Sequence, residues 1–224
     1  VLESQIIAAP EPKPPDLPAT GRFNKDLAGH DNNYWGYVPE NYNPAHGYGL
    51  VVWIHPGSDT MEADMFDLWK PICEQRGLIL FGPRAKEIAG WNLNEAGFIE
   101  ALVKEMQQRY NIDDQRIVLH GYSDGCRFAY HLAFKYRSLF RGVAASSEPL
   151  KVTPPENRPD LRLQFFLSCG DKDNLYRRVQ QTRSRLAAMK FPVTFSTLAG
   201  AGHEYPTIPV LDAIGRWIDM LDRI

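Results

Sequence analysis

Apolar residues follow two alternating patterns along the chain from residue 34 onward. Short continuous runs rich in Val, Ile, Leu and Phe predict buried β-strands, and longer segments with apolar residues three or four positions apart predict amphipathic helices. The predicted strands cover residues 34–38, 50–54, 78–81, 117–120, 142–145, 163–168 and 193–197. The predicted helices cover residues 62–74, 94–110, 124–136, 175–189 and 208–221.

Strand–helix alternation of this kind is typical of the α/β class. It predicts a mostly parallel central sheet with helices on both faces. In the helix at 94–110 we expect Asn94 to be the N-cap. The proline-containing stretch at 146–160 predicts an irregular segment near a site, and it is too short to form a large cap domain.

The chain divides into two expected parts. Residues 1–30 begin with a proline-rich stretch and predict an extension or linker, and residues 31–224 predict a single catalytic domain. The first residue is Val1 rather than methionine, so we expect that a signal peptide or an upstream domain has been removed. This favours an exported protein, and the linker is expected to tether it to a larger polypeptide. A cytoplasmic multidomain parent is the alternative.

Composition narrows the functional classes. The chain has 224 residues, a net charge of −2, and 44% hydrophobic residues, so nothing indicates binding to nucleic acid or an anionic membrane. No apolar run is long enough to span a bilayer. The scattered histidines and three cysteines lack metal-ligand spacing, so we expect no metal and no cofactor. We expect the three cysteines to be buried free thiols, with one disulfide and one free thiol as the alternative.

The most informative motif is GYSDG at residues 121–125. It follows a predicted strand and precedes a predicted helix, which is the context in which G-x-S-x-G forms a nucleophile elbow. A serine hydroxyl is a poor nucleophile unless a base takes its proton and a further group orients that base. Ser123 is therefore the candidate nucleophile, provided that both partners follow it in the chain.

Both partners are present downstream in the expected order of acid and then base. His131 lies within the helix after the elbow and cannot reach back, which leaves His203 in the glycine-rich loop after the last strand. The loop after the strand at 163–168 offers Asp171 and Asp173. We favour Asp173 as the acid because the chain needs a few residues to turn over the sheet edge, with Asp171 as the alternative. Because an imidazole base acts only when neutral, activity should fall in acid.

The oxyanion of an acyl-transfer reaction needs backbone N–H donors. One expected donor is the N–H of Asp124, directly after the nucleophile. The other is the N–H of Gly57 or Ser58 in the loop after the strand at 50–54, because Pro56 has no N–H. The Asp124 carboxylate is then expected to turn to solvent or to Arg127, away from the developing negative charge.

These segments together resemble compact α/β-hydrolase esterases, similar to the polyhydroxybutyrate depolymerase, feruloyl esterase and phospholipase/carboxylesterase-like groups. The matching segments are YVPENYNP, LVVWIHPGSD, the tryptophan at 91, YNIDDQRIVLHGYSDGCRFAYHLA, CGDKDNLY and GAGHEYP. The resemblance implies an α/β-hydrolase fold and hydrolysis of carboxylic esters through an acyl-enzyme, with Ser123, Asp173 and His203 as the triad. The chain departs from the families at Pro56 and Cys126, where they usually have glycine.

Further residues are candidates by position. Trp91, Tyr122 and Tyr205 are expected to line the substrate, with ordinary core packing as the alternative for Trp91. His55 is expected to hold the oxyanion loop. The expected substrate is a small-molecule or polymer-borne ester, since the lack of a cap predicts an open site. A serine peptidase and a non-catalytic hydrolase-fold binding module are the alternatives.

Overall fold

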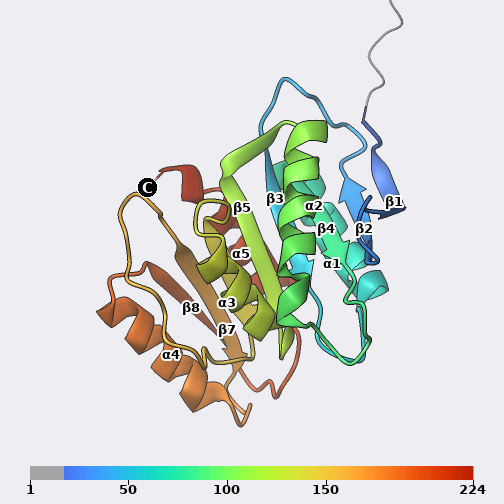
Figure 1. Cartoon of the computed structure of the whole chain (residues 1–224). Helices are drawn as coiled ribbons and strands as arrows, with labels where there is room; N and C mark the ends of the chain where they lie inside the picture. Colours follow the sequence, from blue (N-terminus) through green and yellow to red (C-terminus); the bar gives the residue numbers. More distant parts are fainter. Residues whose placement is uncertain (1–17, 224) are drawn as a thin grey trace, which may run out of the picture.

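The computed structural model describes residues 18–223, and its strands form one eight-stranded sheet in the order β1-β2-β4-β3-β5-β6-β7-β8 (Figure 1). β2 pairs antiparallel with β1 and β4, and the other neighbours are parallel. The strands are β1 (Gly21–Asp26), β2 (Asn33–Val38), β3 (Tyr48–Ile54), β4 (Leu78–Pro83), β5 (Ile112–Tyr122), β6 (Gly142–Ser146), β7 (Gln164–Gly170) and β8 (Val193–Leu198). The α-helices are α1 (Glu62–Arg76), α2 (Ala96–Arg109), α3 (Gly125–Lys135), α4 (Tyr176–Ala188) and α5 (Ile208–Ile218).

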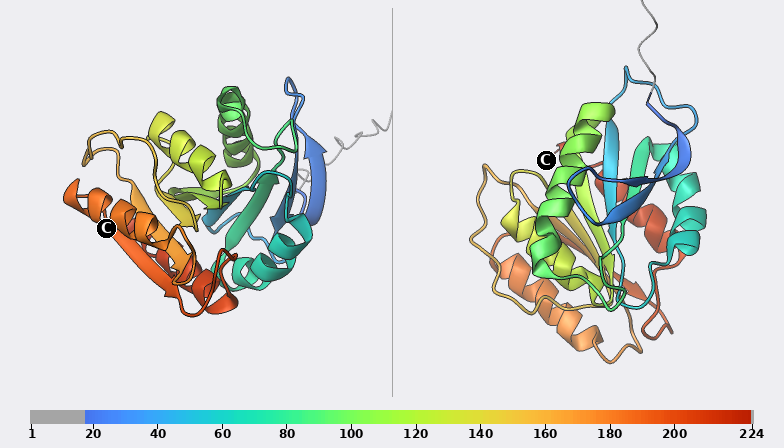
Figure 2. Two further views of the ribbon diagram at one scale, coloured as in Figure 1. Left: turned by 90° about the horizontal axis from the view of Figure 1, so that it is seen from below. Right: turned by 45° about the vertical axis from the view of Figure 1, so that its right-hand side comes forward.

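Two apolar cores lie on opposite faces of the sheet, because successive side chains of a strand point to opposite sides. In β3, Leu50, Val52 and Ile54 pack with α2 and α3, whereas Val51 and Trp53 pack with α1 and α5. Figure 2 shows helices on both sides of the sheet. The predicted α/β class, with a mostly parallel sheet and helices on both faces, is confirmed, and no large cap occurs in residues 18–223.

The predicted domain boundary at residue 30 is wrong, because Gly21–Asp26 form the edge strand β1. Its side chains are mostly exposed, so this strand has no continuous apolar run for a sequence pattern to detect. Backbone pairing with β2 holds this segment in the sheet instead. The proline-rich part at residues 1–17 lies outside the described residues.

The predicted N-cap of the second helix is also wrong. Asn92, rather than Asn94, accepts the capping hydrogen bond, and it caps the short 3-10 turn Leu93–Glu95 that leads into α2. Glu95 accepts the Asn92 N–H in return, which completes a capping box. The expectation of free thiols is confirmed, because Cys73, Cys126 and Cys169 are all buried and unpaired by disulfides.

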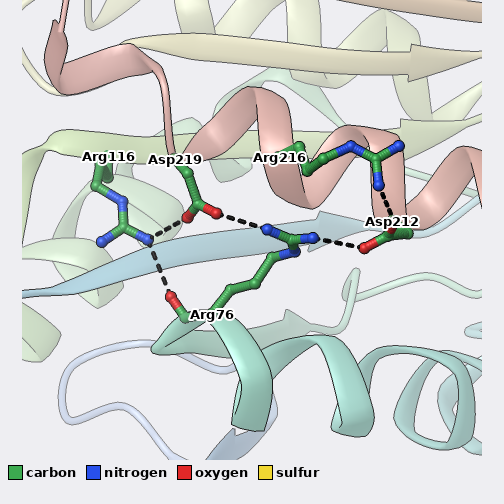
Figure 3. Close-up of polar contacts among 5 residues, drawn as sticks. All are labelled: Arg76, Arg116, Asp212, Arg216 and Asp219. Atoms are coloured by element: carbon green, nitrogen blue, oxygen red, sulfur yellow. Dashed lines mark hydrogen bonds and ion pairs between the residues drawn. The ribbon is translucent and has the colours of Figure 1, made fainter.

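A network of arginines and aspartates fixes α5 against α1 and β5 (Figure 3). Arg76, at the end of α1, donates to Asp212 at 2.7 Å and to Asp219 at 2.8 Å. Arg116 of β5 donates to Asp219 at 2.9 Å, and Arg216 pairs with Asp212. Helix α5 starts directly after the loop that carries His203. The network therefore fixes the helix into which this loop leads.

Candidate active site

The GYSDG motif forms a sharp turn between β5 and α3, as the sequence predicts. Ser123 has a φ of 51°, a left-handed backbone conformation that is strained for a non-glycine residue. A Cβ at position 125 would lie 2.3 Å from the carbonyl oxygen of Ile54, so only glycine allows the turn to approach the end of β3. This contact brings Ser123 beside the loop that follows β3.

Ser123, His203 and Asp173 form one hydrogen-bonded chain, although they come from three separate loops. The Ser123 hydroxyl lies 2.9 Å from His203 Nε2, and His203 Nδ1 lies 2.8 Å from Asp173 Oδ2. Since a carboxylate only accepts, Nδ1 carries the imidazole proton and Nε2 is free to accept from the serine. This is the geometry that general-base activation of a serine requires.

The Asp173 side chain is completely buried, and both of its carboxylate oxygens accept hydrogen bonds. Its Oδ1 accepts the N–H of Leu175 at 2.8 Å, while Oδ2 accepts from His203 and from the thiol of Cys169, whose sulfur lies 3.6 Å away. Burial, together with the Asp173 charge, raises the pKa of Cys169 to about 12, so the thiol stays protonated and can donate. Asp171, the alternative acid, instead accepts the N–H of Gly200 at 2.8 Å.

The expected oxyanion donors lie together, but two of the three groups have unexpected partners. The Ser58 N–H donates to the Ile88 carbonyl at 2.6 Å. The Gly57 N–H donates to the Asp124 carboxylate at 3.0 Å. The expected orientation of Asp124 toward solvent or Arg127 is therefore wrong, and the partner of Arg127 is Glu148, at 2.7 Å from Nε.

His55 fixes the start of this loop. Its Nδ1 donates to the Pro56 carbonyl at 2.7 Å, and its Nε2 accepts the Ala85 N–H at 3.0 Å. Burial lowers the pKa of His55, so it holds both bonds in its neutral form. These contacts join the loop after β3 to the loop after β4.

A cavity of about 660 Å³ adjoins the elbow on its α3 side. Trp91 and Phe128 contribute aromatic wall, with their rings stacked 4.9 Å apart, and Trp91 Nε1 donates to the His55 carbonyl at 3.0 Å. The charged lining residues are Lys86, Glu87, Glu95, Asp124 and Arg127. Trp91 thus packs against Phe128 and also lines the cavity, and its contact with a substrate stays a prediction.

Glu95 stabilises the backbone that forms this cavity wall. It is buried, and its carboxylate accepts the backbone N–H groups of Lys86 and Asn92 and the side-chain amide of Asn32, each at 2.7 Å. The loop between β4 and α2 is therefore tied down at both ends, and the cavity has a defined shape.

Tyr122 and Tyr205 both lie close to His203 but differ in surroundings. The Tyr122 hydroxyl donates to the His203 carbonyl at 2.9 Å, and its ring lies 5.5 Å from the imidazole. The Tyr205 hydroxyl points inward, where it accepts from Trp69 Nε1 at 2.9 Å and lies 2.6 Å from His120 Nε2. The expectation that Tyr205 lines the substrate is therefore wrong for its hydroxyl, which is a structural anchor.

His120 completes this buried link. Its Nδ1 donates to the Ala144 carbonyl at 3.0 Å, so Nε2 accepts the Tyr205 hydroxyl. Burial lowers the pKa of His120 to about 4, which keeps the ring neutral. Sequence analysis missed this connection, since Trp69 and Tyr205 are 136 positions apart and no motif joins them.

Comparison with known proteins supports this architecture. No protein-family model matches the chain. A ferulic acid esterase structure superposes with a TM-score of 0.67 at 16% identity, covering 92% of this chain and 99% of the other. A Bacteroides ovatus chain described as a dipeptidyl aminopeptidase IV gives a TM-score of 0.70 at 15% identity, with coverages of 91% and 36%. The chain has the α/β-hydrolase fold.

One curated relative of this chain has a named activity. A bifunctional acetylxylan esterase/xylanase from Neocallimastix patriciarum is 25% identical over 118 residues. The matched stretch is 50% of this chain and only 17% of that protein. Other solved structures of similar fold include S-formylglutathione hydrolases and an arylesterase.

Two further properties concern the part of the chain that the structure describes. Within residues 18–223, no helix is long and apolar enough to cross a membrane. The same residues contain no group of three or more His, Cys, Asp or Glu side chains placed to hold a metal ion.

Proposed function

We propose that the protein is a serine hydrolase that cleaves carboxylic esters through an acyl-enzyme intermediate. The observation that carries the proposal is the continuous hydrogen-bonded chain from Ser123 through His203 to the buried Asp173. The strained elbow supports it, because such strain holds the nucleophile at the end of its strand.

In the proposed reaction, His203 Nε2 takes the hydroxyl proton as Ser123 Oγ attacks the ester carbonyl carbon. Asp173 keeps the Nδ1 proton in place and stabilises the imidazolium that forms. The N–H groups of Asp124 and Gly57 stabilise the oxyanion. His203 then gives its proton to the leaving alcohol, and a water molecule, activated in the same way, releases the acid and restores Ser123.

The substrate we favour is an ester carried by a small molecule or a polymer. The lack of a large cap in the described residues supports a site that admits the end or side group of a long molecule, and the curated relative is named as an acetylxylan esterase. A serine peptidase is the second candidate, favoured by the dipeptidyl aminopeptidase-like structure that superposes with a TM-score of 0.70. The same catalytic groups would serve either bond.

The proposal includes a tether to a larger polypeptide through the proline-rich segment before β1. The bifunctional relative, of which the matched stretch is 17%, supports such an arrangement. Intact-mass analysis of the native protein tests it: further sequence before Val1 supports a tether, and its absence counts against one.

The decisive experiment compares hydrolysis of p-nitrophenyl acetate, butyrate and octanoate by wild type, Ser123→Ala and Ser184→Ala. Ser184 is an exposed serine on α4, so its variant controls for serine replacement as such. We expect turnover by wild type and the control and none by Ser123→Ala. Cleavage of a peptide p-nitroanilide in the same assay would indicate a peptidase. Absence of Ser123 labelling by a fluorophosphonate would indicate a non-catalytic binding module.

A further inference from the structure

The Asp124 side chain occupies an unusual place for a residue at the start of a helix. An aspartate at an N-cap normally accepts a backbone N–H of its own first turn. Asp124 is the N-cap of α3, but its side chain makes no such capping bond. Its Oδ1 instead accepts the N–H of Gly57, which is 67 positions away, at 3.0 Å.

The surrounding backbone holds Gly57 in this contact. A Cβ at Gly57 would lie 2.4 Å from the Ala89 carbonyl and 3.1 Å from Asp124 Oδ2, so the loop, the wall of the cavity and the carboxylate are in close contact. The next N–H, that of Ser58, is already used by the Ile88 carbonyl. Of these two N–H groups, that of Ser58 donates to a backbone carbonyl, whereas that of Gly57 donates to a side chain.

We propose that the Asp124 carboxylate fills the oxyanion position at Gly57 in the free enzyme and that the substrate carbonyl must displace it. This inference rests on the proposed function. A carboxylate oxygen resembles the oxyanion in charge and in its need for an N–H donor. It competes with the substrate for that donor, and its negative charge beside the reacting carbonyl opposes the charge that develops there.

The structure also offers a place for the displaced side chain. Asp124 lines the cavity of about 660 Å³, and the half-exposed Arg127 lines it one helical turn further along α3. The Arg127 guanidinium pairs through Nε with Glu148, and a carboxylate that leaves Gly57 moves into a space with a cation at its wall. Asp124 therefore sets the reactivity of the site without taking part in bond making.

The test uses Asp124→Ala and Asp124→Asn with p-nitrophenyl butyrate. The alanine variant frees the Gly57 N–H, and we expect kcat/KM to rise about tenfold, the lower end of what a hydrogen bond to a charged group is worth. The asparagine variant keeps an acceptor of the same shape without the charge, so we expect a smaller rise. Unchanged or lower kcat/KM in the alanine variant, with thermal unfolding near that of wild type, would overturn the inference.

A second readout isolates the oxyanion position itself. An arylboronic acid forms a tetrahedral adduct with the serine and places an oxygen in that position. Its inhibition constant should fall in Asp124→Ala by about the same factor as kcat/KM rises. If the inhibition constant is equal in wild type and Asp124→Ala, the inference is also overturned. This comparison remains valid even if the variant unfolds at a lower temperature than wild type. If wild type neither hydrolyses the ester nor reacts with a fluorophosphonate at Ser123, the proposed function itself has failed.

Discussion

Replacing Tyr205 by phenylalanine tests whether this tyrosine is an anchor or a substrate contact. The change removes one oxygen that joins Trp69 Nε1 at 2.9 Å to His120 Nε2 at 2.6 Å. Both partner side chains are fully buried, so water cannot replace the lost hydroxyl. Each buried group left without a partner costs about 1–3 kcal/mol, and two such groups predict a loss of about 3 kcal/mol in the free energy of unfolding.

The assay is urea unfolding followed by tryptophan fluorescence, with Tyr122→Phe as the matched control. Tyr122 makes one hydrogen bond, to the His203 carbonyl, at a partly exposed position where water can substitute, so its loss should stay below about 1 kcal/mol. Because Tyr205 is two residues from His203, we also expect kcat to fall with KM little changed. A stability loss below about 1 kcal/mol in Tyr205→Phe, or a raised KM at unchanged stability, would refute the anchoring role.

Two further predictions concern stability. The pKa of His120 is lowered to about 4 by burial, whereas in the unfolded chain it stays near 6.5. The unfolded state therefore binds the proton first, and stability is lost as the pH falls from about 6.5 to 4, at about 1.36 kcal/mol per unit. Between pH 7 and pH 5, the free energy of unfolding should fall about 2 kcal/mol further in wild type than in His120→Asn, and equal falls would contradict this. Arg76→Ala should lower the free energy of unfolding by about 1–2 kcal/mol, because it removes two partly buried ion pairs and the packing of its stem on Gly215. Chemical denaturation measures this, with the exposed Arg158→Ala as control, and equal effects of the two variants would argue against the anchoring of α5.

The sequence by itself determined the fold class and the order of its main elements. Most of the strands have apolar runs because helices cover both faces of the sheet, and burial on both faces leaves a continuous pattern. The edge strand β8 is only partly buried, and its apolar residues Val193 and Phe195 alternate with polar ones. The candidate triad of Ser123, Asp173 and His203 could also be predicted from the sequence, because a nucleophile elbow needs small residues at fixed spacing and its partners follow in a fixed order. The edge strand β1 could not be predicted from the sequence, since its side chains are mostly exposed and form no continuous apolar run.

Only the tertiary structure decided how distant segments meet. It placed Asp173 rather than Asp171 against His203, since that choice depends on where the chain turns after β7. It also joined Asp124 to Gly57 across 67 positions. Such contacts depend on how strands and loops are brought together in space, and a single sequence records spacing along the chain but not proximity across it.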